Sequence, residues 1–412
     1  MAASIGAHAL EALARRAAEA VCVADARYDC TAKLAQTADL FAQVIASGRF
    51  LPQFLTELDD DERRNWVECC PPEEDDAPAA QEEAYVRAMP QGRGVWFPPA
   101  VRGKNPVPQA GAQTVAVRCL QPLLPCEGIA LGCVNLAAHL GAGDLPALDE
   151  ALLCDTVSIA VHLLDNALDA AGYPDGRCSR MTRATRRIGI GVMGLAEVLD
   201  ARGLAYDSDE ARAFAAGVWR TLRTQAEEAS RRLALARGPF PLFAESVYKD
   251  GAARRNAALT AQAPDAALAA LCGVTPGALP RGEASAEACL RMQAALQDEA
   301  DGAVLLPVRF ASRDEAQRLC ALAYSLGCAG VAIDRGDEGR AQPEKAAQEA
   351  EPPAGGQASL ATSAEGSEAQ SRTQVQWDEA RFCPNCGRPL QRERGRLCCP
   401  TCGPLPSPQT AE

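Results

Sequence analysis

The chain has 412 residues with a formal net charge of −13 at pH 7, and 48% of its residues are hydrophobic. This length and apolar content suffice for a substantial buried core. The acidic balance argues against binding of a nucleic-acid backbone, because phosphate contacts need clustered cations. No stretch reaches the roughly 18 consecutive apolar residues of a membrane span, and the first residues lack the apolar centre of a secretory signal. We therefore expect a cytoplasmic protein that binds neither nucleic acid nor membrane.

The first part of the chain predicts helices followed by an acidic linker. Residues 8–48 place apolar side chains at helical spacing, and this stretch continues into SGRFLPQFL (47–55). Residues 58–84 are acidic and contain proline, which favours a loop. We assign an N-terminal helical segment to residues 1–57 and an acidic, proline-bearing linker region to residues 58–112.

Regular elements begin near residue 113. We predict a strand and turn over 113–125, a long amphipathic helix between 143 and 174, and helices near 191–202 and 208–237. The last of these opens with the acidic run from Asp207 to Glu210, which suits a helix N-terminus. The middle of the chain, 113–336, is therefore expected to be one folded unit.

The end of this unit predicts a strand-helix-strand element. Apolar runs at 303–310 and 330–335 flank a helical stretch at 313–326, an order typical of a helix packed on a sheet. Residues 337–380 are rich in Ala, Glu, Gln, Ser, Pro and Gly and have almost no large apolar side chain, so we predict a disordered linker.

Four cysteines near the C-terminus have the spacing of a metal knuckle. Cys383 and Cys386 form one C-x-x-C pair, and Cys399 and Cys402 form a second. Such pairs direct four thiolates at one tetrahedral zinc ion, and a module of this size needs a metal or disulfides for order. The alternative is a redox arm, in which a C-x-x-C pair exchanges electrons with a buried disulfide. We favour zinc and assign the knuckle to residues 381–405.

Two other features are interpreted structurally. Gly189, Gly191 and Gly194 form a G-x-G-x-x-G pattern, but TRATRR (182–187) precedes it instead of an apolar strand, so we expect close packing at a helix start and not a dinucleotide site. His8, His139 and His162 have no Cys or carboxylate at catalytic spacing, and we expect ordinary surface or core roles for them.

A series of motifs in the middle of the chain resembles a known family. They are QPLLP (121–125), VNLAAHL (134–140), LLDNALD (163–169), TRATRRIGIGVMGLAEVL (182–199), YDSDEA (206–211), RGPFPLFAES (237–246), RRNAALTAQAP (254–264), CLRMQAALQ (289–297) and AYSLGCAGVAIDR (323–335). In this order they resemble the C-terminal half of ribonucleotide reductase large subunits. The last motif and the cysteine-rich tail are similar to the adenosylcobalamin-dependent class. The resemblance covers about 115–335, the tail and a short N-terminal piece around SGRFLP.

The resemblance implies catalytic groups that this sequence lacks. The family carries Asn-x-Cys-x-Glu just before QPLLP, where the cysteine forms a thiyl radical and the other two side chains handle ribose hydroxyls. Here Ala116, Arg118 and Leu120 occupy those positions. Cys119 is one residue away, which turns a side chain to the opposite face of an extended segment. No catalytic residue is therefore retained at a family position.

Two further sites implied by the resemblance have also changed. The second site cysteine of the family aligns with Ile129, with Cys126 and Cys133 nearby but displaced. The phosphate-binding turn, Pro-Thr-Gly-Thr at a helix N-terminus in the family, reads Pro264 followed by Asp265, and a carboxylate there repels phosphate and competes for its amides. Residues 53–115 are too few and too acidic to encode the first half of the family's ten-stranded barrel.

These observations predict an α/β, helix-rich fold: a partial ribonucleotide-reductase-type barrel remnant with C-terminal helices, a disordered linker and a small four-cysteine zinc-ribbon-like tail. We hypothesise a non-catalytic bacterial homologue that acts as an accessory or binding protein in deoxyribonucleotide metabolism, with an intact ribonucleotide reductase or a thiol carrier as partner. One alternative is an active ribonucleoside-diphosphate reductase chain that needs a partner polypeptide and adenosylcobalamin, with Cys119, Cys126 or Cys133 as substitutes. The other is a zinc-ribbon interaction module on an inert scaffold.

Overall fold

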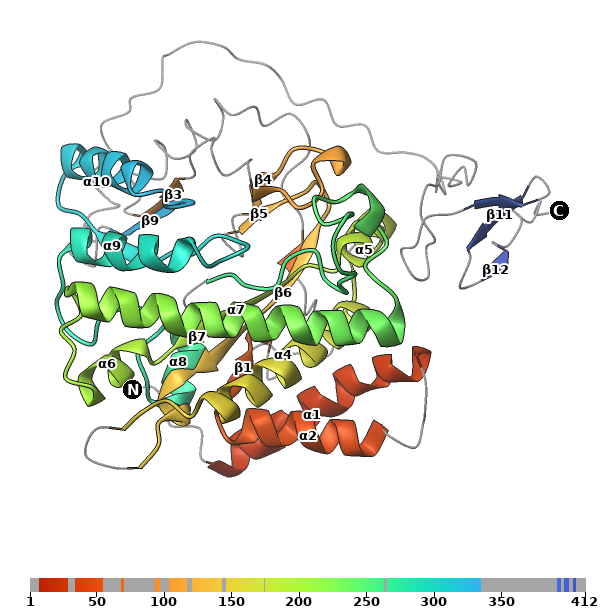
Figure 1. Ribbon diagram of the computed structural model, residues 1–412, viewed down its shortest axis with the longest axis horizontal. Coiled ribbons are helices and arrows are strands. Elements are labelled where there is room, and N and C mark those ends of the chain that lie inside the picture. The colour runs from red at the N-terminus through yellow and green to blue at the C-terminus, as the bar shows by residue number, and fades with distance from the viewer. Residues whose placement is uncertain are drawn as a thin grey trace, which may run out of the picture.

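Helices surround a small mixed sheet in the computed structural model (Figure 1). The structure describes residues 7–28, 34–54, 68–69, 93–96, 104–116, 121–142, 146–173, 175–262, 265–334, 391–393, 396–399 and 403–404. Its helices are α1 (Ala7–Cys22), α2 (Leu34–Ala46), α4 (Glu150–Ala170), α5 (Gly176–Thr185), α6 (Leu195–Ala201), α7 (Asp209–Arg237), α8 (Ala266–Cys272), α9 (Ala286–Gln297) and α10 (Arg313–Ser325), with 3-10 turns η1 (Val23–Arg27), η6 (Pro108–Ala110), η7 (Leu136–His139) and η8 (Phe243–Glu245). This confirms the helix-rich α/β prediction.

The central strand of the sheet is β6 (Gly128–Asn135), which is buried along its whole length. On one edge it pairs antiparallel with β1 (Phe50–Pro52) and, further along, with β2 (Glu68–Cys69). On the other edge it pairs in parallel with β7 (Ile188–Met193). Parallel bridges from Ile190 to Thr260 and from Gln262 to Val304 extend this order. The sheet is thus an open arc of parallel segments, and it does not close into a barrel within the described residues.

The long helix α4 forms the core of the body. Asp149 caps its first turn by accepting a hydrogen bond from the Leu152 N–H at 2.9 Å. Its buried side chains join one hydrophobic cluster with α1, α2, β6, β7 and α7. By length and composition it is the one helix among the described residues that could cross a membrane, but 61% of its most apolar window is buried inside the protein, which is typical of a core helix.

Helix α7 lies alongside α4 and runs across the molecule (Figure 1). Ser208 caps it by accepting a hydrogen bond from the Ala211 N–H, and Asp209 and Glu210 lie in its first turn. A carboxylate there offsets the partial positive charge of the helix N-terminus. The predicted helix at 208–237 and the acidic start are both confirmed.

The predicted helix at 191–202 is wrong in its first part, because residues up to Met193 belong to strand β7. Gly189 and Gly191 lie in β7 and let this strand pack closely against its neighbours. A Cβ on Gly189 would lie 2.5 Å from Leu131 Cδ2, and one on Gly191 would lie 2.7 Å from the Ala261 carbonyl oxygen. Only Gly194, with φ +74°, lies at a helix start, where it precedes α6.

Glutamine side chains complete the hydrogen bonding of the last parallel segment, 303–306. Gln121 donates to the Ala303 carbonyl (3.0 Å) and accepts from its N–H (2.8 Å). On α9, Gln297 accepts from the Val304 N–H and Gln293 accepts from the Leu306 N–H, both at 2.9 Å. These amides pair with N–H groups and a carbonyl as a neighbouring strand would, which offsets the cost of burying this sheet edge.

The strand-helix-strand prediction near the end of the body is confirmed. Strands β8 (Pro307–Arg309) and β9 (Val331–Asp334) are parallel and are joined through α10. Strand β3 (Arg93–Trp96) pairs antiparallel with β9. The predicted strand and turn at 113–125 is a hairpin of β4 (Thr114–Ala116) and β5 (Gln121–Leu123).

Parts of the expected linkers and of the tail lie outside the described residues, including all of 337–380. Within the stretch expected as a linker before residue 113, Val107 is fully buried with Phe240 and Leu242. In the tail, backbone pairing joins β10 (Gln391–Glu393), β11 (Arg396–Cys399) and β12 (Gly403–Pro404) into an antiparallel sheet.

Candidate functional site

Two faces of the central sheet differ in what they bury. Ala130 and Val134 of β6 pack with α4 in the main hydrophobic cluster. Ile129 and Leu131 point to the opposite face, because side chains alternate along a strand. There they form a separate cluster with Leu123 and Ala261. We call this second side the inner face, since the β4–β5 hairpin lies over it.

The inner face contains the positions where the family resemblance implies reacting groups. Ile129, which stands at the second cysteine position, is 2% exposed within an apolar cluster. Ala116 pairs with Gln121 at the end of the β4–β5 hairpin. Arg118, Cys119 and Leu120 lie outside the described residues. The described part of this face therefore offers aliphatic side chains where a thiol would be required.

Cys126 lies in the turn before β6, and Cys133 lies in the second half of that strand. The extended stretch from Gly128 to Cys133 alone spans about 17 Å at the usual rise per residue. Cys126 occupies a tight turn with φ +57°, directly after Pro125. Cys133 is 6% exposed, and burial together with the nearby Asp265 carboxylate raises the pKa of its thiol to about 12. These two thiols cannot act on one substrate atom, and Cys133 stays protonated at neutral pH.

The turn expected to bind phosphate is closed by its own side chain. Asp265 caps α8, and its Oδ1 accepts hydrogen bonds from the Ala267 N–H (2.9 Å) and the Leu268 N–H (3.0 Å). These are the amides that a phosphate would use. An incoming phosphate would meet a carboxylate instead of free N–H donors, as the sequence predicts. Pro264 lies outside the described residues.

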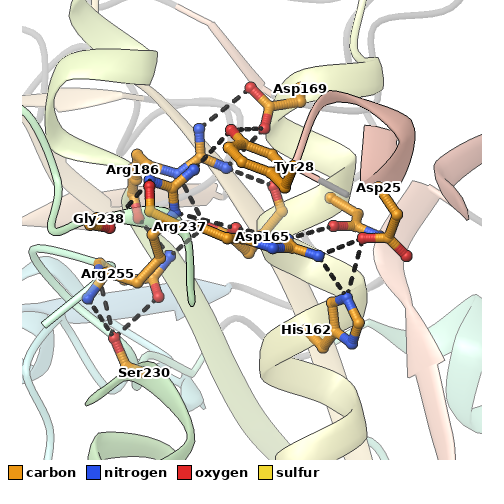
Figure 2. Close-up of polar contacts among 12 residues, drawn as sticks. Asp25, Tyr28, His162, Asp165, Asp169, Arg186, Ser230, Arg237, Gly238 and Arg255 are labelled. Atoms are coloured by element: carbon orange, nitrogen blue, oxygen red, sulfur yellow. Dashed lines mark hydrogen bonds and ion pairs between the residues drawn. The ribbon is translucent and has the colours of Figure 1, made fainter. Parts of the chain in front are cut away.

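A buried polar cluster is centred on α4 and includes Arg237 of α7 (Figure 2). Asp165 of α4 is fully buried and accepts hydrogen bonds from Arg186 Nε (2.8 Å), Arg237 Nη1 (3.2 Å) and Arg255 Nε (3.3 Å). Burial raises the pKa of Asp165, but the charges of Arg186, Arg255 and Arg237 outweigh it and hold the pKa far below its ordinary value. Asp165 therefore remains ionised as the centre of this cluster.

The N-terminal helices are tied into the same cluster. Tyr28, just after η1, donates to Asp169 Oδ2 (2.9 Å) and accepts from Arg255 Nη2 (2.6 Å). The guanidinium groups of Arg237 and Arg255 lie over its ring, at 4.7 Å and 5.0 Å from the centroid. The cluster thus joins four distant parts of the chain by charge and holds the helices in place.

Sequence reasoning missed the role of His162. Its Nε2 lies 3.0 Å from Asp25 Oδ1 and 2.7 Å from Arg237 Nη2, although these residues are 137 and 75 positions away in the chain. The spacing of these residues in the sequence does not indicate the contact, because it depends on how η1 and α7 pack against α4. His139 has the expected core role: it is buried, with its ring nitrogens 2.7 Å from the Asn135 carbonyl and 2.9 Å from Thr156 Oγ1.

The tail cysteines are only partly placed. Cys399 ends β11 and pairs in antiparallel register with Gly403 of β12. An antiparallel pair of strands beside a cysteine is compatible with a metal knuckle. Cys383, Cys386 and Cys402 lie outside the described residues. No cluster of three or more His, Cys, Asp or Glu side chains suited to a metal is present within the described part of the chain.

Comparison with known proteins finds similarity over part of the body of the fold. A family model described as "Ribonucleotide reductase, barrel domain" matches residues 126–258. The chain is 40% identical over 188 residues to the "Vitamin B12-dependent ribonucleoside-diphosphate reductase" of Mycobacterium tuberculosis, covering 45% of this chain and 27% of that protein. It is 33% identical over 201 residues to the protein of the same name from Thermoplasma acidophilum, covering 48% of this chain and 26% of the relative.

A relative of a different description matches a shorter stretch. The "Ribonucleoside-diphosphate reductase subunit alpha" of Chlamydia trachomatis is 36% identical over 138 residues, which is 32% of this chain and 13% of that protein. The chain thus spans about a quarter, or less, of the length of these relatives.

Proposed function

We propose that this chain is a non-catalytic member of the ribonucleotide reductase family. The proposal starts from its partial similarity to the large subunit of the B12-dependent class. It acts by binding, as an accessory protein in bacterial deoxyribonucleotide metabolism. An intact ribonucleotide reductase or a thiol carrier in the cytoplasm is its partner. The proposal separates the fold, which the chain retains in part, from the site, which carries the chemistry.

The observation that carries this proposal is the closed inner face. A radical reductase needs thiols that can be oxidised next to the substrate, and the described part of this face has Ile129 in an apolar cluster with Leu123 and Leu131. The phosphate turn is occupied by Asp265. A chain without the thiol cannot carry out the radical reaction, and a chain without free phosphate-binding amides cannot hold the substrate by its phosphate.

Adenosylcobalamin, which the names of the relatives imply, does not fit the residues present. In that class the group supplies a radical to a cysteine, and Arg118 stands at the corresponding position of this sequence. Of the described thiols nearest to it in sequence, Cys126 lies in the turn before β6 and Cys133 lies buried in the second half of that strand. Neither is placed to accept the radical that the cofactor would supply.

The tail is the candidate binding element. Its paired cysteines, Cys383, Cys386, Cys399 and Cys402, have the donor chemistry of a closed zinc site. The fold-back of β11 on β12 next to Cys399 supports a knuckle. In the alternative role the same thiols pass electrons to a partner's disulfide.

An active chain completed by another polypeptide is the main competitor. The other polypeptide would have to supply the first half of the family's barrel as well as the radical thiol, because Cys133 of this chain is buried and protonated. A zinc-ribbon module on an inert scaffold is the other competitor. It predicts that deleting residues 337–412 abolishes partner binding while the body stays folded.

One experiment separates these functions. The full chain is assayed for ribonucleoside-diphosphate reduction with adenosylcobalamin and a dithiol, beside an intact B12-dependent reductase as positive control, and zinc is measured in the same sample. We expect no deoxynucleotide and one zinc per chain, with zinc lost in the Cys383→Ser/Cys386→Ser variant. Turnover that disappears on Cys119→Ser, Cys126→Ser or Cys133→Ser would overturn the non-catalytic proposal. Absence of zinc together with a reducible tail disulfide would replace the zinc knuckle by a redox arm.

A further inference from the structure

We draw no further inference here: the strongest candidate, the two buried guanidinium groups of Arg187, directly before β7, and of Arg254, on the connection from α7 to α8, carries nothing, because each already pairs with a carboxylate, that of Glu127 or of Asp301, and nothing in the described part of the chain shows an ion or a cavity beside its unpaired Nη2 donor.

Discussion

The cluster around Asp165 provides the most direct test of what holds this fold together. Replacing Asp165 by Asn removes a buried carboxylate from Arg186, Arg237 and Arg255 and turns an N–H₂ group toward cationic donors. Breaking one buried ion pair costs about 3–5 kcal/mol, because the remaining charge stays buried without its partner. With three guanidinium groups affected, we expect the upper end of that range. Such a loss is comparable with the whole stability of many domains, about 5–15 kcal/mol.

The pH dependence of this effect follows from the low pKa of Asp165 in the folded protein. The ordinary value is 3.8, and the folded value lies below it. The carboxylate therefore contributes its full stabilisation above about pH 4, and the contribution is lost only as the pH falls through the folded pKa. The difference in unfolding free energy between wild type and Asp165→Asn should be constant from pH 5 to pH 8 and shrink only in stronger acid.

Urea unfolding followed by circular dichroism measures this difference. Asp200→Asn is the matched control, since Asp200 pairs with Arg281 at 3.3 Å while both side chains are more than half exposed. After solvent screening we expect that change to cost at most about 0.5 kcal/mol. If Asp165→Asn costs no more than Asp200→Asn, the cluster does not organise the core and our account of it is refuted.

Four smaller perturbations test other parts of the structure. Cys126→Gly should raise the unfolding free energy by about 1 kcal/mol, because φ +57° suits glycine, and a decrease would contradict the turn geometry. Gln297→Leu should cost at least about 2 kcal/mol in urea unfolding by leaving the Val304 N–H and Gly302 carbonyl unpaired, whereas a neutral result would mean that water replaces the amide. Asp265→Ala should cost about 1 kcal/mol by loss of the helix cap, and an unchanged midpoint would argue against the cap. Cys133 should resist iodoacetamide at pH 7.5 until urea unfolds the chain, because burial raises the pKa of its thiol to about 12, and fast labelling of the native protein would contradict that burial.

Local sequence signals predict the elements that depend on local chemistry. Ser208 with the acids that follow it marks the start of α7, and Asp149 precedes α4, because capping needs only neighbouring residues. The prediction from the glycine pattern was wrong in part: we expected Gly189 and Gly191 at the start of a helix, but both lie in strand β7. Their requirement is set by Leu131 and Ala261 across the sheet, which are not neighbours in sequence.

The polar cluster could not be predicted from the sequence for the same reason. Asp25, Asp165 and Arg237 are ordinary charged residues on helices, where a charge usually means a solvated face. Their burial follows only when η1 and α7 meet on α4. The candidate site was more accessible to sequence reasoning, since aligned motifs place Ile129 and Asp265 where a thiol and a phosphate turn are expected.

Under the proposed non-catalytic function, the two faces of the sheet would let the chain keep its shape without the reacting groups of the family. The buried ion cluster and the main hydrophobic core lie on the side of α4, and they hold the helices without any group from the inner face. On the inner face, Ile129 and Leu131 pack with Leu123 and Ala261, so replacing a reactive thiol by an aliphatic side chain adds to packing there. If the chain is non-catalytic as proposed, an aliphatic side chain at position 129 would stabilise this face by packing, whereas substitutions in the ion cluster on the other face would destabilise the fold.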